Sequence, residues 1–337
     1  MITLKDVAQK AGVSEATVSL VLNNRTGVNK ETRARVNKLI EKMGYSPNPV
    51  ARSLAMKKTN TIGLVVTDIE NPFFGSITRY ISEQVHRYGY ALVLAASNDD
   101  LQLEEEILST FIERRVDGII IVPTQEIRRD FSIFEAMEKR KIPAVFTTSY
   151  YTRECSCVMT DYAEGSYLAA HHLMELGNKK IFHLVSSDPH APISDFRIRG
   201  YKKAFKEAGV TSKKSWIIPC PKPDFSSGYE VTKALLKKHR PDAIMAINDV
   251  LALGAVKAVK EAGISVPEEI SITGYDDVIF SSISETALTT IRQNIPEIAE
   301  KSVKILIDTL GGKKIEEKIV KIGPELVIRE STGYKKQ

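Results

Sequence analysis

The chain has 337 residues, of which 43% are hydrophobic and 26% are charged. Its length exceeds that of a usual single domain, and its composition is that of an ordinary globular protein, which excludes a disordered chain. No long apolar stretch follows the charged start MITLKDVAQK, so we expect neither a signal peptide nor a membrane span, and we expect a cytoplasmic protein.

The charge is distributed unevenly along the chain. Residues 1–60 hold eleven Lys or Arg against four Asp or Glu, whereas the whole chain has a net charge of only +5. A small module with this positive excess is a favourable surface for a phosphate backbone, although a solvated basic face is the simpler alternative. The local charge therefore favours nucleic acid as a partner.

Two short helices are predicted at the start of the chain. Thr3 and Asp6 form the pattern of a capping box, and the apolar residues that follow have helical spacing up to Gly12, which breaks the helix. Ser14 then offers a second N-cap. In the second helix Val18 and its apolar neighbours Val21 and Leu22 form one stripe. The pattern predicts helix, tight turn, helix.

A third helix is expected from about Lys30, capped by Asn29 and ended by Gly44. Its inward-facing residues are Val36, Leu39, Ile40 and Met43. The three helices would share one small core, which leaves another face of the second helix, with Glu15, Ala16, Ser19 and Leu20, free to meet DNA.

Two runs of residues identify the kind of module. They are LKDVAQKAGVSEATVSLVLNN and VNKETRARVNKLIEKMGYSPNPVARSLA. They closely resemble the DNA-binding segment and hinge of the lactose-repressor (LacI) family, and scattered similarity continues to about residue 330. The resemblance implies a helix-turn-helix domain over residues 1–47. It also implies that the second helix reads bases in the major groove through Glu15, Ala16 and Leu20.

Other positions match family residues that hold phosphates and so fix the register on DNA without reading sequence. They are Ser14, Thr17, Ser19, Asn23, Thr32, Tyr45 and Asn48. For Ser14 and Asn48 simple helix capping is the alternative, and both roles can coexist. Leu20 departs from the Arg or His common at its position, so contact with a thymine methyl is the natural interpretation.

Residues 48–60 form the predicted hinge. Asn48-Pro49 is a helix start, and VARSLA is about two turns long, too short to persist alone. The resemblance implies that one hinge helix from each subunit of a homodimer enters the minor groove of a pseudo-palindromic operator. Leu54 would be wedged into the central base step with help from Arg52. A buried core leucine is the alternative for Leu54.

From residue 61 to 332, short β-rich runs alternate with helical stretches. The first series is TIGLVV, ALVLAA, DGIIIV and PAVFTT, and the second is KIFHLV, WIIP, DAIMAI and ISITGYD. Alternation of this kind predicts parallel strands with crossover helices, in two doubly wound α/β lobes. The segment is similar to periplasmic sugar-binding proteins. We therefore expect a periplasmic-binding-protein-like effector domain.

In the repressor family the chain crosses between the lobes three times, and we place these crossings near residues 160, 290 and 322. The first lobe would comprise about residues 61–160 and 291–321. The second would comprise about residues 161–290 and 323–332. Ligands of open α/β sheets bind beyond the carboxyl ends of the strands, so pocket residues are expected there.

Five residues are the candidates for binding an effector. They are Phe73, Phe74, Arg197, Asn248 and Asp276. The two phenylalanines could stack on a ring or belong to the core. The resemblance implies that the arginine reaches ligand oxygens, with Arg199 as a solvated alternative, and that the amide and carboxylate meet hydroxyls. A helix cap and a turn are the alternatives for these last two residues, and Asp161 and Asp249 are expected to be caps.

Thr148 and Ser149 replace the acidic or aromatic residues common at these positions in the lactose and purine repressors. We expect the effector to be a sugar or sugar derivative, with a purine or another metabolite as the alternative. The sequence predicts a transcription regulator that acts as a repressor, is associated with the nucleoid and is controlled allosterically by this ligand.

A cleft enzyme is the competing function class, but the sequence carries no G-x-S-x-G, no phosphate-binding loop and no metal-spaced pair of histidines. The three cysteines Cys155, Cys157 and Cys220 include only an isolated C-x-C, so no metal site and no disulfide are predicted. We therefore expect no catalytic residues and no cofactor.

Overall fold

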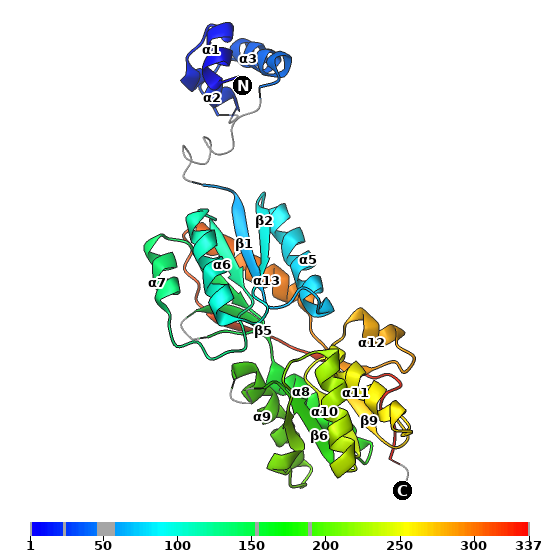
Figure 1. Cartoon of the computed structure of the whole chain (residues 1–337). Coiled ribbons are helices and arrows are strands. Elements are labelled where there is room, and N and C mark those ends of the chain that lie inside the picture. Colours follow the sequence, from blue (N-terminus) through cyan, green and yellow to red (C-terminus); the bar gives the residue numbers. More distant parts are fainter. Residues whose placement is uncertain (1, 23–24, 46–57, 152–154, 188–190, 336–337) are drawn as a thin grey trace. The chain divides into compact units, whose positions relative to one another are not determined.

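The computed structural model describes residues 2–22, 25–45, 58–151, 155–187 and 191–335, and the chain divides into two compact units between Thr59 and Asn60 (Figure 1). The first unit is helical and the second is α/β, and each has its own hydrophobic core. Among the helices of the described residues, none combines the length and the apolar character needed to cross a membrane.

The first unit contains the three predicted helices, α1 (Leu4–Ala11), α2 (Glu15–Leu22) and α3 (Lys30–Met43). The predicted capping box is confirmed, since Asp6 N donates to Thr3 Oγ1 over 3.3 Å and Thr3 N donates to Asp6 Oδ2 over 2.8 Å. Gly12 ends α1 with a φ of 63°, a left-handed conformation that glycine adopts without a side-chain clash.

The boundaries of α3 are also those predicted. Thr32 N donates to the side-chain oxygen of Asn29 over 2.8 Å, and Gly44 ends the helix in the left-handed conformation. One small core joins the three helices, and its buried members are Val7, Ala8, Ala11, Val18, Val21 and Val36. Because α2 uses one face for this core, its opposite face is left to solvent.

The first sheet of the second unit is parallel, with the strand order β11-β5-β4-β3-β1-β2. Its strands are β1 (Thr61–Val66), β2 (Ala91–Ala96), β3 (Gly118–Ile121), β4 (Ala144–Thr147), β5 (Ser156–Thr160) and β11 (Ile319–Ile322). The helices packed with it are α5 (Pro72–Arg87), α6 (Leu101–Glu113), α7 (Ser132–Lys139) and α13 (Ile295–Leu310). We call this the first lobe.

Alternation along the central strands decides which helices cover which face of this sheet. Ile119 and Ile121 of β3 pack with the buried residues of α6 and α7, whereas Ile120 packs with those of α5 and α13. Successive side chains of a strand point to opposite faces, so both faces of the sheet are buried. The strands end together at one edge.

The second sheet has the order β12-β10-β9-β8-β6-β7 and forms the second lobe (Figure 1). Its strands are β6 (Ile181–Val185), β7 (Ile217–Pro219), β8 (Ala243–Ala246), β9 (Ser271–Asp276), β10 (Thr289–Arg292) and β12 (Glu325–Val327). Its helices are α8 (Tyr162–Glu175), α9 (Pro192–Glu207), the short η1 (Lys214–Trp216), α10 (Phe225–Lys238), α11 (Asp249–Glu261) and α12 (Ile279–Ile283). Strand β12, which was not among the predicted strands, runs antiparallel to β10.

The chain passes from the first sheet to the second after Thr160, returns after Arg292 and passes again after Ile322. The crossing predicted near residue 290 therefore comes after strand β10. The reason is that Thr289 and Thr290 are fully buried and pair in register with β9. The second lobe thus keeps residues 291 and 292, which the prediction assigned to the first.

Glycine lets the helices of the second lobe approach closely. A Cβ atom on Gly200 of α9 would lie 1.9 Å from the carbonyl oxygen of Ala163, and one on Gly254 of α11 would lie 2.2 Å from that of Phe225. Such distances cannot be relieved by a side-chain rotation, because the opposing atoms are backbone. The backbone of α9 therefore packs closely against that of α8, and the backbone of α11 packs closely against that of α10.

Candidate functional site

The exposed face of α2 carries the residues predicted to read bases. Glu15 and Ala16 are exposed, and Leu20 is half-buried. Thr17 N donates to Ser14 Oγ over 3.2 Å, and the two hydroxyls are 2.9 Å apart. Ser14 is thus the helix cap that the sequence predicted, with its hydroxyl still exposed and available to a phosphate.

The remaining phosphate candidates are divided between described and undescribed parts of the chain. Ser19, Thr32 and Tyr45 are half-buried, and Tyr45 packs against the core of the first unit. Asn23, Asn48, Arg52 and Leu54 lie outside the described residues. The predicted roles of the hinge residues in the minor groove therefore stay predictions.

A cleft of about 940 Å³ lies between the lobes of the second unit, at the carboxyl ends of the strands. All five predicted effector residues line it. The first lobe contributes Asn71, Phe73, Phe74, Gln125 and Thr148, and the second contributes Arg197, Asn248 and Asp276, with Gln293 at the second crossing. The geometry thus brings together residues that lie far apart in sequence, from Asn71 to Gln293.

The two phenylalanines at the start of α5 have different surroundings. Phe73 is only 4% exposed and belongs to the core of the first lobe, whereas Phe74 is half-buried, and their rings meet edge to face at 5.1 Å. Asn71 caps this helix by accepting from Phe73 N over 3.0 Å. Phe73 is therefore a core residue that also lines the cleft, and its stacking on a ligand ring stays a prediction.

Arg197 lies between two aromatic rings at the base of the cleft. Its Cζ atom is 4.7 Å from the ring centroid of Tyr162 and 4.5 Å from that of Tyr275. The residue is 9% exposed, and its Nε has no hydrogen-bond partner among the described residues. A buried donor without a partner is costly, so a ligand oxygen here would be favoured.

The alternative arginine is placed differently. Arg199 lies on the outer face of the same helix, α9, where its Nε is 3.0 Å from Asp195 Oδ2 and its side chain is 56% exposed. It does not line the cleft. Arg199 is therefore the solvated surface charge.

Asn248 is both the N-cap of α11 and part of the cleft wall. Its Oδ1 accepts from Leu251 N over 2.7 Å, and its Nδ2 donates to the carbonyl oxygen of Pro223 over 2.8 Å. These bonds fix the amide, so the capping role and a ligand role are compatible at this position.

Asp276 ends β9 in a conformation with a φ of 111°, which favours glycine and is strained for aspartate. Gln293 Nε2 donates to its Oδ1 over 2.7 Å, and Gln293 also accepts from the hydroxyl of Thr160 at the first crossing. Burial raises the pKa of Asp276 well above its ordinary value, and the nearby charge of Asp249 raises it further. The strain is local to a residue that faces the cleft.

Gln293 was missed in the sequence prediction. It follows strand β10 directly, so its signal is the same strand-end position that identified Asn248 and Asp276. The signal was hidden because no strand was predicted at residues 289–292, where the crossing near residue 290 was placed.

Asp161 caps α8 as predicted, but Asp249 is not a cap. Asp249 is the first residue of α11 and is fully buried. It accepts from Val278 N over 2.8 Å and from Thr290 Oγ1 over 2.5 Å, and burial raises its pKa to about 7. The cap prediction was wrong because the preceding Asn248 already holds the helix end.

This raised pKa predicts a pH dependence of stability. Between about pH 4 and pH 7 the folded chain binds a proton at Asp249 that the unfolded chain has released, so the free energy of unfolding falls as pH rises through this range. Asp249→Asn should remove the contribution of Asp249 to this dependence and leave that of Asp276, whose pKa is also raised. Between pH 5 and pH 8 the Tm of the variant should therefore fall less than that of the wild type, by a difference of at least about 4 °C.

Calorimetry at several pH values measures the effect. Glu113→Gln, which changes an exposed carboxylate, is the control and should keep the wild-type slope. Equal slopes in Asp249→Asn and the wild type would mean that Asp249 titrates near its ordinary pKa.

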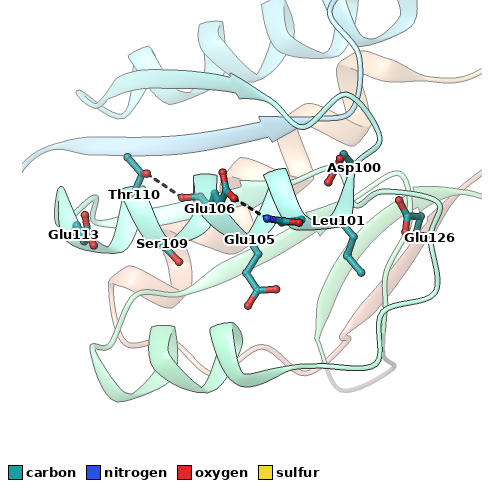
Figure 2. Close-up of a pocket in the computed structure, with 9 residues that line it drawn as sticks. Asp100, Leu101, Glu105, Glu106, Ser109, Thr110, Glu113 and Glu126 are labelled. Atoms are coloured by element: carbon teal, nitrogen blue, oxygen red, sulfur yellow. Dashed lines mark hydrogen bonds between the residues drawn. The ribbon is translucent and has the colours of Figure 1, made fainter.

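A second hollow, of about 850 Å³, runs along α6 (Figure 2). It is lined mainly by carboxylates, among them Glu105, Glu106 and Glu113, and Gln102 Nε2 donates to Glu106 Oε1 over 3.2 Å. Within the described residues no group of carboxylate, histidine and cysteine ligands could hold a metal ion. The hollow is an acidic surface groove.

Comparisons with known proteins agree with this architecture. Residues 3–48 match the family of bacterial regulatory proteins, lacI family, and residues 170–332 match the periplasmic binding protein-like domain. The chain is 35% identical over 333 residues to the HTH-type transcriptional repressor PurR of Mannheimia succiniciproducens, and the alignment covers 98% of each protein.

Solved structures give the same result. The lac repressor dimer bound to operator and the anti-inducer ONPF has a TM-score of 0.86 at 27% identity, covering 98% of this chain and 99% of that one. A LacI family regulator from Enterococcus faecium with bound ribose has a TM-score of 0.72 at 30% identity, covering 82% and 100%. The chain therefore belongs to the lacI family of bacterial regulatory proteins, as a DNA-binding transcription regulator and not an enzyme.

Proposed function

We propose that this regulator is a repressor that binds a pseudo-palindromic operator as a homodimer, and that a sugar in the interlobe cleft controls its operator affinity. It would act in the cytoplasm, at the nucleoid. The observation that carries the proposal is Arg197, a buried guanidinium that lines the cleft and whose Nε has no partner within the described part of the chain. The same chain carries an exposed helix α2 in its first unit.

The lining of the cleft suits a sugar. Carboxylates and amide oxygens accept from hydroxyl groups, and the cleft holds Asp68, Asp99 and Asp276 beside the amides of Asn71 and Gln125. A guanidinium donates to ring or carbonyl oxygens, which a sugar also offers. The relative from Enterococcus faecium was solved with ribose, which supports this class of ligand.

Two surfaces support the homodimer. The short helix α12 exposes the apolar side chains of Ile279, Phe280 and Ile283, and the edge strand β2 exposes those of Val93 and Leu94. Clustered apolar side chains on a surface are typical of interaction sites. The lac repressor, to which this chain is similar, was solved as a dimer on its operator.

Selection of binding sites from random duplex DNA tests the DNA-binding half of the proposal. Two recognition helices related by a two-fold axis should select a pseudo-palindrome with half-sites about one helical turn apart. Ala16→Arg should change the selected bases within each half-site and leave the spacing unchanged. Selection of a single unsymmetrical half-site bound by a monomer would contradict the proposed architecture.

A further inference from the structure

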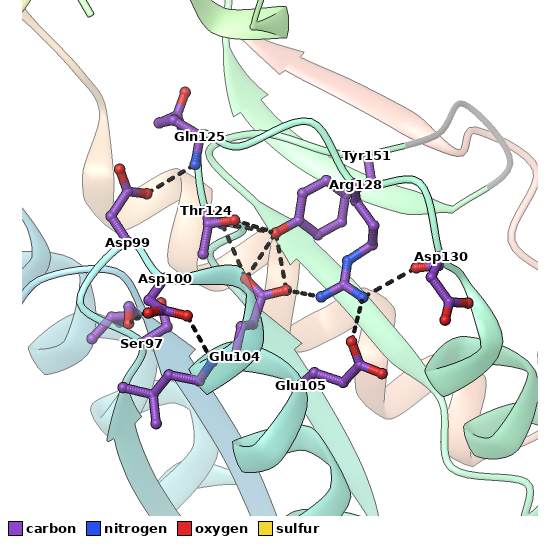
Figure 3. A network of polar contacts seen from close by, with 12 residues as sticks. Ser97, Asp99, Asp100, Glu104, Glu105, Thr124, Gln125, Arg128, Asp130 and Tyr151 are labelled. Atoms are coloured by element: carbon purple, nitrogen blue, oxygen red, sulfur yellow. Dashed lines mark hydrogen bonds and ion pairs between the residues drawn. The ribbon is translucent and has the colours of Figure 1, made fainter. Parts of the chain in front are cut away.

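A buried polar network lies under one wall of the cleft, in the first lobe (Figure 3). Glu104 of α6 and Arg128 form an ion pair, with 3.0 Å between Oε1 and Nη2 and with side chains 0% and 1% exposed. Thr124 N donates to Glu104 Oε2 over 3.0 Å, and the Tyr151 hydroxyl lies 2.9 Å from both carboxylate oxygens.

Most of the polar groups in this network have a partner, although Arg128 Nε has no hydrogen-bond partner among the described residues. Burial raises the pKa of Tyr151, so its hydroxyl keeps its proton and donates to Glu104, while it accepts from Thr124 N over 2.9 Å. Arg128 also donates to the carbonyl oxygen of Asp130 over 3.2 Å, and its guanidinium lies over the rings of Phe134 and Tyr151 at 5.2 and 5.0 Å. The network therefore fixes side chains from three separate segments.

Those three segments continue into the cleft wall. The loop of residues 122–131 follows β3, and its Gln125, Glu126 and Ile127 line the cleft. Gln125 N donates over 2.8 Å to Asp99, which precedes α6 and also lines the cleft. The third segment follows β4, where Thr148 lines the cleft three residues before Tyr151. By contrast, Glu104, Arg128 and Tyr151 themselves do not line it.

Stability alone does not account for such a pair. Desolvation of two charges often cancels their attraction, so a buried ion pair frequently contributes little net stability compared with apolar residues of the same size. A charge-assisted pair with fixed geometry does, however, orient the groups that it joins. Here the oriented parts are the backbone of Thr124 and the loop of residues 122–131, which carries four residues of the cleft wall.

We propose that Glu104, Arg128 and Tyr151 are positioning residues that hold the 122–131 loop in its binding conformation, and so set effector affinity without contacting the effector. The effect on effector affinity rests on the proposed function. The effect on the conformation of the loop does not. Loss of the network should loosen the loop while the fold of both lobes remains.

Hydrogen exchange of the full chain without any ligand tests the hold on the loop. Tyr151→Phe removes one hydroxyl and keeps the ring, and amides of residues 122–131 should then exchange at least about tenfold faster, with the other segments of both lobes unchanged. Glu104→Gln should have a larger effect on the same loop. If Glu104→Gln fails to fold, Tyr151→Phe alone decides.

The matched control is Tyr201→Phe. The Tyr201 hydroxyl is also buried and donates over 2.8 Å to the carbonyl oxygen of Ile181, which begins β6 at the strand end away from the cleft. This variant should leave exchange in the 122–131 loop at the wild-type rate. Unchanged loop exchange in Tyr151→Phe, or faster exchange throughout both lobes, would overturn the proposal.

A binding measurement separates this proposal from the proposed function. D-ribose, D-glucose and adenine are titrated into the wild type, and any of them that binds should bind at least about fivefold more weakly to Tyr151→Phe, with Tyr201→Phe unaffected. If no sugar binds the wild type, the sugar proposal fails, and the exchange result still decides whether the network holds the loop. If Tyr151→Phe and the wild type bind the ligand with equal affinity, the claim that the network sets effector affinity is contradicted.

Discussion

Arg197→Met should abolish the response of operator binding to sugar, while operator affinity without sugar changes by less than about tenfold. The guanidinium is buried between two aromatic rings, and its Nε has no other partner among the described residues. A ligand changes DNA affinity only through its different affinities for two arrangements of the protein. Without the group that holds ligand oxygens at the base of the cleft, this difference disappears.

The matched control for this substitution is Arg199→Met, on the exposed face of the same helix. It removes an equal charge, which pairs with Asp195 at the surface, where such pairs contribute little, and lies over the ring of Phe196. Calorimetry with sugar and a DNA titration of each variant measure both effects. Undiminished sugar binding in Arg197→Met would remove this arginine from the site.

Ile279→Asp combined with Ile283→Asp should convert the dimer to a monomer and weaken operator binding by at least about a hundredfold. The two isoleucines are 63% and 66% exposed on α12, and a carboxylate placed in an apolar interface would be desolvated without a partner. Each monomer would then hold a single half-site and lose the contribution of the second.

Sedimentation equilibrium and a DNA titration of the double variant test this prediction. Tyr334→Asp is the control, because Tyr334 is 79% exposed near the end of the chain and not on α12. A double variant that stayed dimeric would show that α12 is not the dimer surface.

Much of the fold could be predicted because local chemistry specifies it. Thr3, Asp6, Asn29 and Gly44 mark helix ends through groups that act within four residues, and the eight predicted strand runs are strands in the structure. Strand β10 was missed because TTIR looks polar. Its threonines are buried because β10 lies between two other strands, β9 and β12, and this pairing cannot be read from the local sequence.

The site was predicted in part for the same reason. Arg197, Asn248 and Asp276 occupy strand-end or helix positions that a family resemblance can transfer, and all three line the cleft. The pair of Glu104 and Arg128 could not be predicted, because charged residues 24 positions apart are expected at the surface. Their burial depends on the packing of α6 against a loop that has no regular secondary structure.

The central claim is that one chain couples a sugar site to an operator site, and a single titration tests it most directly. The full chain is titrated onto its selected operator by fluorescence anisotropy, with and without D-ribose or D-glucose at saturating concentration. The account predicts that one sugar changes the operator Kd by at least about tenfold, the range of a typical allosteric coupling, and leaves binding to random DNA unchanged. An operator Kd that no sugar alters would contradict it.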